Sequence, residues 1–396
     1  MQMEAFFRTH AYLVEHTDAP VRRQLMDDID WNDRMIGIKG TRGVGKTTFL
    51  LQYAKEHFAP TDRRCLYINM NNFYFQSRGI ADFANEFYHG GGRVLLIDQV
   101  FKQSDWSREL RRCHDDCPGL KIVFTGSSVM RLKEENPELG GVVKSYNLRG
   151  FSFREFLNLQ TNNKFRSYSL DEILHDHEHI VKQILPKVSP TEHFKAYVHH
   201  GFYPFFRERR NFSENLLKTM NMMTEVDILL IKGIELKYLT KIKKLFYLLA
   251  VEGPKSPNIS QLALDVETSR ATVMNYIKYL ADARLINIIY RPGESFPKKP
   301  AKVLMHNPNL IYAIYPIKVD LQNVMETFFV NALWKDHKVD QSDRRSYYVV
   351  DEHLRFKIAD NTNARSRDSQ DLYVARYNRE VGRGHEIPLW LFGFLY

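Results

Sequence analysis

Eight residues near the N-terminus have the types and the spacing needed to hold a phosphate chain. Residues 40–47 (GTRGVGKT) contain three glycines, followed by a lysine and a residue with a hydroxyl group. Glycines let the backbone curl until its N–H groups face phosphate oxygens; Lys46 can neutralise the β and γ phosphates, and Thr47 can offer its hydroxyl to Mg²⁺. We predict a nucleotide site made of Gly40, Arg42, Gly43, Val44, Gly45, Lys46, Thr47, Thr48 and, from a later strand, Ser127.

A carboxylate that completes such a site ends an apolar segment further along the chain. Residues 93–98 (RVLLID) fit a buried strand with Asp98 at its end, where it can hold Mg²⁺. The next residue is Gln99, where many ATPases of this layout carry a glutamate. An amide orients water but accepts protons poorly, and general-base help is worth about 10²- to 10⁴-fold in rate. We predict Thr47 and Asp98 as metal ligands, and Lys46, Asp98 and Gln99 as catalytic residues of a slow Mg²⁺-dependent ATPase. The alternative is that Gln99 faces solvent and that the base lies elsewhere in the chain.

A third polar group follows the apolar segment 121–126 (KIVFTG). Thr125, Ser127 and Ser128 stand at the end of this predicted strand, where an α/β fold gathers residues around its ligand. Ordinary hydrogen bonding within a turn explains the same residues equally well. Both interpretations stay open.

The sequence also predicts the scaffold that these residues need. Buried strands are expected at residues 34–39, 65–70, 93–98, 121–126 and 142–148, with helical stretches between them. This alternation is typical of a parallel sheet covered by helices, and the glycine-rich loop falls between the first strand and a helix. We assign residues 1–150 to an N-terminal segment and an α/β P-loop core.

The composition is typical of a globular protein with several domains. The chain has 396 residues, more than one core usually fills, and its net charge of +9 favours nucleotides, nucleic acid or an anionic surface as partners. Cys65, Cys113 and Cys117 are too few for a disulfide scaffold, and the sequence shows no signal peptide, so we expect reduced thiols and a cytoplasmic location. Residues 387–396 (IPLWLFGFLY) are too short to cross a bilayer; we predict a buried closing strand and no membrane partner.

Residues 151–235 are predicted to form a helical lid. Two capping boxes begin helices there, Ser152 with Glu155 and Ser169 with Glu172. His175 and His179 lie four residues apart on the second helix, which is the spacing of a metal pair, but a solvated polar face is the favoured interpretation. Packing is the favoured role of His199 and His200.

Residues 236–295 are predicted to form a winged helix-turn-helix, with helices near 239–249, 259–266 and 269–283 and a strand at 285–290. The third helix would read double-stranded DNA, and basic residues near the wing would contact phosphates. A lid or a dimer surface is the alternative, since acidic residues on these helices repel phosphate. The DNA-binding candidates are Arg270, Thr272, Asn275, Lys298 and Lys299, with Ser269, Arg291 and Lys302 beside them.

Several segments together resemble a prokaryotic, largely uncharacterised family of AAA-like ATP-binding proteins. They are GTRGVGKTTFLLQ, VLLIDQVFK, IVFTGSS, LRGFSFREFL, YVHHGFYPFF, METFFVNALW and IPLWLFGFLY, and the resemblance covers nearly the whole chain. It implies ATP or ADP with Mg²⁺, a helical lid, a winged helix and a C-terminal domain similar to restriction endonucleases. The family usually has Glu where this chain has Gln99. Arg149 or Arg154 could serve as a phosphate sensor, although a structural arginine is the favoured interpretation.

Residues 296–396 are predicted to form a small, nuclease-like α/β domain without activity. A nuclease of that fold needs Glu-x-Lys on a strand to hold Mg²⁺, and the segment RFKIAD lacks it. The carboxylates available are Glu326, Asp351 and Asp360. Binding or dimerisation is the favoured role.

Three functions follow from these patterns. The first is an ATP-binding switch with slow hydrolysis, the second a DNA-binding regulator with a structural nucleotide, and the third an ATP-dependent, self-associating defence or signalling scaffold with a protein partner. We favour the first. No Asn-Lys-x-Asp guanine motif is present, so adenine is the expected base.

Overall fold

Five apolar segments of the N-terminal part form one parallel sheet. The strands are β1 (Met35–Gly40), β2 (Cys65–Asn69), β3 (Val94–Asp98), β4 (Lys121–Ser127) and β5 (Lys144–Asn147), and they pair in the order β2-β3-β4-β1-β5. All five predicted strands are therefore confirmed. Strand β4 lies between β1 and β3, so its end comes between the glycine-rich loop and Asp98.

This computed structural model describes residues 2–130, 132, 136–208, 211–229, 233–344, 347–360 and 372–396. The chain divides into two compact units, Met1–Gly150 and Phe151–Tyr396. No helix of the described residues has the length and apolar character needed to span a membrane. Cys65, Cys113 and Cys117 are buried free thiols.

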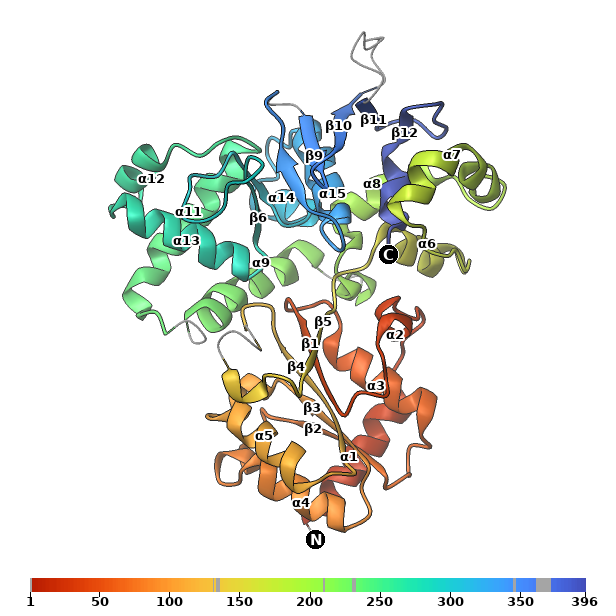
Figure 1. Cartoon of the computed structure of the whole chain (residues 1–396), viewed down its shortest axis with the longest axis vertical. Helices are drawn as coiled ribbons and strands as arrows, with labels where there is room; N and C mark the ends of the chain where they lie inside the picture. The colour runs from red at the N-terminus through yellow and green to blue at the C-terminus, as the bar shows by residue number, and fades with distance from the viewer. Residues whose placement is uncertain are drawn as a thin grey trace. The chain divides into compact units, whose positions relative to one another are not determined.

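Helices cover both faces of the N-terminal sheet (Figure 1). The chain moves in opposite directions across the sheet in the β1-to-β2 connection and in the next two, so right-handed crossovers place α3 on one face and α4 and α5 on the other. Helix α1 contacts α3 and strand β2. The helical elements are α1 (Gln2–His16), α2 (Leu25–Asp28), α3 (Lys46–His57), α4 (Ile80–His89) and α5 (Trp106–Asp116), with short turns η1 (Phe73–Gln76), η2 (Val100–Lys102) and η3 (Pro137–Leu139).

The second unit begins with helices. Both predicted capping boxes are present: each serine hydroxyl accepts from the backbone of the glutamate three residues on, and each glutamate accepts from the serine backbone. The elements are α6 (Phe153–Thr161), α7 (Leu170–Ile184), α8 (Pro190–Ala196), η4 (Tyr197–Gly201), η5 (Pro204–Glu208), α9 (Phe212–Met222) and η6 (Met223–Ile228).

A short 3₁₀-helix, three α-helices and an antiparallel hairpin follow. They are η7 (Leu236–Tyr238), α11 (Leu239–Glu252), α12 (Ile259–Asp265), α13 (Arg270–Asp282), β6 (Ile286–Ile289) and β7 (Lys302–Met305). The helices and the strand expected between residues 239 and 290 are thus confirmed as elements.

The rest of the chain packs helices against a mixed sheet. Strands β8, β9 and β10 are antiparallel, whereas β10, β11 and β12 are parallel, in the order β12-β11-β10-β9-β8. The elements are α14 (Pro308–Ile314), α15 (Leu321–Leu333), β8 (Val339–Gln341), β9 (Tyr347–Val350), β10 (Leu354–Ala359), β11 (Leu372–Arg376), β12 (Glu386–Pro388) and η8 (Leu389–Phe394). The rings of Phe329, Phe356 and Phe392 meet in its core.

The predicted closing strand is wrong over most of its length. The segment is buried as expected, but the strand ends at Pro388, and residues 389–394 form the 3₁₀-helix η8. Proline has no N–H to donate to a ladder, so strand pairing stops there. All six residues of η8 are buried, which shows that hydrophobic character alone did not specify an extended backbone.

Candidate functional site

The glycine-rich loop adopts backbone conformations that only glycine adopts readily. Gly43 has φ of 78° and Gly45 has φ of 92°, both in the left-handed region. At Gly40, a Cβ atom would lie 2.5 Å from the carbonyl oxygen of Leu148. Each glycine of the motif therefore has its own geometric reason, and together they turn the chain from β1 into α3.

The lysine of the loop points back into it. Lys46 is the first residue of α3, and its Nζ donates to the carbonyl oxygens of Gly40 and Thr41, each at 2.8 Å. No acidic residue stands in the first turn of this 12-residue helix, so the helix itself places no negative charge at its positive end. Thr48 is exposed in the same turn. The arrangement fits the binding of a phosphate chain.

Asp98 lies fully buried at the end of β3 and accepts hydrogen bonds on both carboxylate oxygens. Its Oδ2 accepts from the Thr47 hydroxyl at 2.7 Å, and its Oδ1 accepts from the Thr125 hydroxyl. A hydroxyl that donates its proton to a carboxylate keeps oxygen lone pairs free for a cation. Thr47 and Asp98, distant in sequence, are thus in contact, and the pair fits a Mg²⁺ ion.

Two donors from β2 complete the surroundings of Asp98. The Tyr67 hydroxyl donates to Oδ2 at 2.9 Å and the Asn69 amide at 3.3 Å. Burial, and next the charge of Asp98, raise the pKa of Tyr67. The sequence analysis did not single out Tyr67. The available signal was the two-residue spacing in a predicted strand, which places both side chains on one face.

Gln99 stands directly after β3 in a left-handed conformation, with φ of 59° and ψ of 48°. Its backbone N–H donates to the Thr125 hydroxyl at 2.9 Å. Across the described ranges of the chain, its side-chain amide makes no hydrogen bond. Non-glycine residues are uncommon in this conformation and cluster at functional sites. Gln99 therefore stands directly after Asp98, held beside Thr125 by its backbone, in a conformation that is typical of functional sites.

The hydroxyl residues at the end of β4 divide into two kinds. The Thr125 hydroxyl joins Asp98 to the backbone of Gln99 and so positions the site. Ser127 is paired with Gly40 across the sheet, and its Oγ accepts weakly from Val129 N at 3.4 Å. Ser127 therefore lies beside the loop. It also makes the ordinary turn contact that was the alternative interpretation of this residue.

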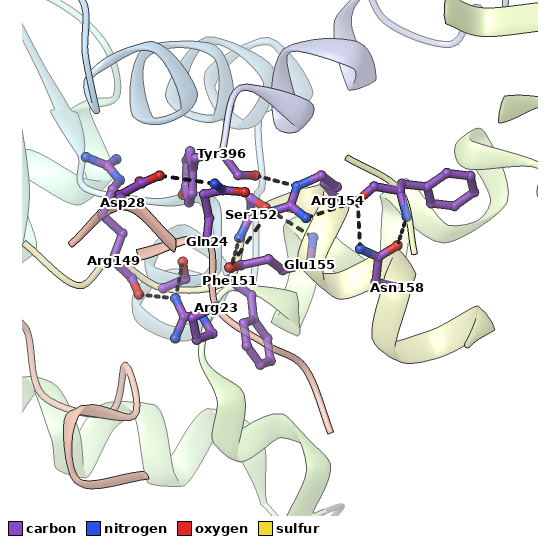
Figure 2. Close-up of polar contacts among 12 residues, drawn as sticks. Arg23, Gln24, Asp28, Arg149, Phe151, Ser152, Arg154, Glu155, Asn158 and Tyr396 are labelled. Carbon is purple, nitrogen blue, oxygen red and sulfur yellow. Dashed lines mark hydrogen bonds and ion pairs between the residues drawn. The ribbon is translucent and has the colours of Figure 1, made fainter. Parts of the chain in front are cut away.

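Both arginines considered as sensors make main-chain contacts. Arg154 is buried in the second unit; its Nε donates to Tyr396 O at 3.0 Å and its Nη1 to Phe165 O at 3.1 Å (Figure 2). These contacts favour a structural role for Arg154. In the first unit, Arg149 offers its carbonyl oxygen to Arg23 Nη2 at 2.6 Å.

The histidines of α7 make polar contacts on their own helix. His175 Nδ1 pairs with Asp171, and His179 Nε2 bonds to Gln183. Within the parts of the chain that the structure describes, no three His, Cys, Asp or Glu residues gather as a metal site. These findings favour the polar face over a metal pair.

The charges of the C-terminal part are paired in ways the sequence did not suggest. Lys302 was expected to contact phosphate, but it is buried, and its Nζ lies 2.8 Å from Glu326 Oε2 and 3.0 Å from the Tyr348 hydroxyl. That expectation is wrong: β7 turns Lys302 toward α15, where burial is tolerated because Glu326 supplies the opposite charge. Asp351 likewise pairs with His337 at 2.6 Å. Glu326 and Asp351 thus serve as partners of basic residues.

The remaining DNA-binding candidates are accessible. Arg270 and Asn275 are exposed on α13, whereas Thr272 is partly buried and its backbone N–H donates to the Ser269 hydroxyl. Lys298 and Lys299 are exposed between β6 and β7. Lys278, on α13, lies 4.5 Å from the ring centre of Phe296 in the same connection. The β6–β7 connection therefore contacts helix α13.

Comparison with known proteins assigns the first region. Residues 32–157 match a family model described as an AAA domain, and residues 191–318 match one described as a domain of unknown function, DUF8612. The first match spans all five strands of the parallel sheet, so the N-terminal unit is similar to an AAA domain. The expected helix-turn-helix lies within the second match.

Two curated relatives come from Methanocaldococcus jannaschii. Uncharacterized protein MJ1637 is 28% identical over 326 residues, which is 78% of this chain and 67% of that protein. Uncharacterized protein MJ1544 is 25% identical over 279 residues, which is 64% of this chain and 55% of that protein. This chain therefore spans only part of each relative. A solved structure titled "Structure of C. elegans PCH-2" matches with a TM-score of 0.24 and 19% identity, over 41% of this chain and 46% of that chain.

Proposed function

We propose that the N-terminal unit binds Mg-ATP and hydrolyses it slowly, so that the protein works as a nucleotide-gated switch. The observation that carries this proposal is the contact between the Thr47 hydroxyl and the Asp98 carboxylate at 2.7 Å, made by a loop whose glycines have the required geometry. The match of residues 32–157 to an AAA domain supports it.

Each side chain has a defined part in this function. Lys46 and the N–H groups of the loop hold the phosphates, while Thr47 and Asp98 hold Mg²⁺. The metal neutralises charge that develops on the transferred phosphoryl group. Gln99 orients water but takes up no proton, because its amide is a poor base. We therefore expect the unit to bind Mg-ATP and to hydrolyse it slowly.

A contact in the first unit explains how the loop could signal. Arg23 is buried; its Nη1 donates to Val44 O in the loop at 3.0 Å, and its Nη2 donates to Arg149 O and Gly150 O (Figure 2). One guanidinium thus joins the phosphate-binding loop to the last residues of the unit. A movement of the loop on binding nucleotide would therefore shift Arg23 and, through it, the backbone of residues 149 and 150, the last residues of the first unit.

Nucleotide binding and turnover, measured side by side, test the proposal. Lys46→Ala should abolish ATP affinity, and Gln99→Glu should raise the turnover rate by about tenfold or more by restoring a base. Lys55→Ala, on the same helix, is the matched control. Brisk turnover by the wild type with no gain in Gln99→Glu would refute the role given to Gln99; absence of ATP binding would refute the function.

DNA binding is a second candidate, supported by the exposed basic residues of α13 and the β6–β7 connection. The order of three helices followed by a hairpin supports the proposal of a winged helix, a fold that presents its third helix to DNA. Duplex affinity should fall with salt, and neutralising Arg270, Lys298 and Lys299 should reduce the salt slope. Lys182→Ala, an exposed lysine on α7, is the control. Equal affinity of all these variants would exclude this surface.

A further inference from the structure

Tyr67 is a buried tyrosine whose hydroxyl meets the carboxylate at the centre of the candidate site. The hydroxyl donates to Asp98 Oδ2 at 2.9 Å and lies 3.2 Å from the Asn69 amide nitrogen, which donates to it. The side chain is only 4% exposed. The Asn69 amide also donates directly to Asp98 Oδ2 at 3.3 Å, and the Thr47 side chain hydrogen-bonds to the Tyr67 hydroxyl, so Asp98 is the acceptor toward which that hydroxyl points.

The backbone of Tyr67 is fixed from the opposite side. Strand β2 is at the edge of the sheet, and the Tyr67 N–H, which has no further strand to bond, donates to His10 Nδ1 of helix α1 at 3.0 Å. His10 is itself buried. Helix α1 therefore holds the main chain of Tyr67 while Asn69 and Asp98 hold its hydroxyl.

The donors around Asp98 differ in what nucleotide binding would do to them. Thr47 belongs to the phosphate-binding loop and is a proposed metal ligand, so its bond to Asp98 must adjust when the ion arrives. Tyr67 belongs to β2, outside the loop, and has no such second task. A carboxylate aimed at a cation must keep one orientation, and fixed donors supply it.

We propose that Tyr67 is a positioning residue of the Mg-nucleotide site, which acts by holding the Asp98 carboxylate in place for the metal. This inference rests on the proposed function. It predicts that removing the hydroxyl weakens the contribution of Mg²⁺ to ATP affinity and leaves metal-free binding to the loop unchanged.

The experiment compares ATP affinity in EDTA and in Mg²⁺, by calorimetry on the full chain. Tyr67→Phe should lose about tenfold of the affinity gained from Mg²⁺, as expected for a hydrogen bond to a charged group. In an Asp98→Asn background the same change should have no further effect, because Tyr67 acts through that carboxylate. Tyr53→Phe, at a buried tyrosine of α3, controls for loss of a hydroxyl elsewhere in the unit.

Every result decides the matter. Equal affinities of Tyr67→Phe and wild type in Mg²⁺ overturn the inference, as does an equal loss in EDTA and Mg²⁺, which would mark a structural role. Full additivity with Asp98→Asn overturns it too. If wild type binds no ATP, the proposed function falls and takes this inference with it. Should Tyr67→Phe be unstable, Asn69→Ala removes the amide that donates to both the Tyr67 hydroxyl and Asp98 Oδ2, and it should show a loss confined to the Mg²⁺ series; an equal loss in EDTA overturns the inference.

Discussion

His10 should make the N-terminal unit less stable in mild acid than at neutral pH. The backbone N–H of Tyr67 can only donate, so His10 Nδ1 must be unprotonated to accept it. The ring proton then sits on Nε2, which is buried and has no hydrogen-bond partner among the residues that the structure describes. A second proton on Nδ1 would confront the Tyr67 N–H, so protonation requires the ring to leave its place.

The size of the effect follows from the pKa. Burial lowers the pKa of His10 from 6.5 to about 4. Between these values the unfolded chain binds a proton that the folded chain refuses, so this contribution to stability is complete above pH 6.5 and is lost as the pH falls toward 4. At about 1.36 kcal/mol for each pH unit, the loss is about 2 kcal/mol at pH 5 and about 3 kcal/mol at pH 4.

Urea unfolding at pH 7 and pH 5 measures this loss. His10→Asn keeps an acceptor near the position of Nδ1 but cannot titrate, so it should lose about 2 kcal/mol less stability than wild type over this range. His16→Asn, at an exposed position of the same helix, should follow wild type. Parallel losses in wild type and His10→Asn would refute the reasoning. Carboxylates titrate in all three proteins and cancel in the comparison.

Three further changes should lower the free energy of unfolding, measured by urea or heat. Lys302→Met leaves Glu326 buried without its cation and should cost about 3–5 kcal/mol, part of which Glu326→Leu in the same chain should restore; strict additivity would contradict the pairing. Gly40→Ala sets a Cβ 2.5 Å from Leu148 O and should cost about 1–3 kcal/mol and weaken ATP binding; unaltered affinity would show that the loop adapts. Ser169→Ala removes a helix cap and should cost about 1 kcal/mol; no change would mean that the helix end is frayed.

The elements of the first unit were predictable because local signals agree there. Residues 94–97 form a short apolar run that is followed by polar residues, and the structure forms β3 at Val94–Asp98. Gly43 and Gly45 predict the backbone of the glycine-rich loop, because both adopt the positive φ that glycine favours. Strand order was not predictable, since no local pattern in β4 indicates that it pairs with both β1 and β3. The place of Thr125 between the loop and Asp98 depends on that order.

Side-chain partners distant in sequence were the part that local patterns missed. Tyr67 looks like any core residue of a strand until β3 is placed beside β2, which brings Asp98 opposite Asn69. Lys302 looks like one of several surface lysines until α15 is packed against β7. In both cases the buried polar group forms a hydrogen bond with a residue of another element, and local sequence patterns do not identify that residue.

The buried lysine also restricts how the β6–β7 hairpin can pair. Lys302 stands opposite Ile289 in the antiparallel ladder. A slip of one residue would turn every side chain of β7 to the other face, carrying Lys302 away from Glu326 and bringing Val303 in its place. The abandoned carboxylate would cost about 3–5 kcal/mol, comparable to much of the net stability of a domain. A single ion pair thus selects one strand register where two strands of four residues each, mostly aliphatic, would otherwise tolerate several.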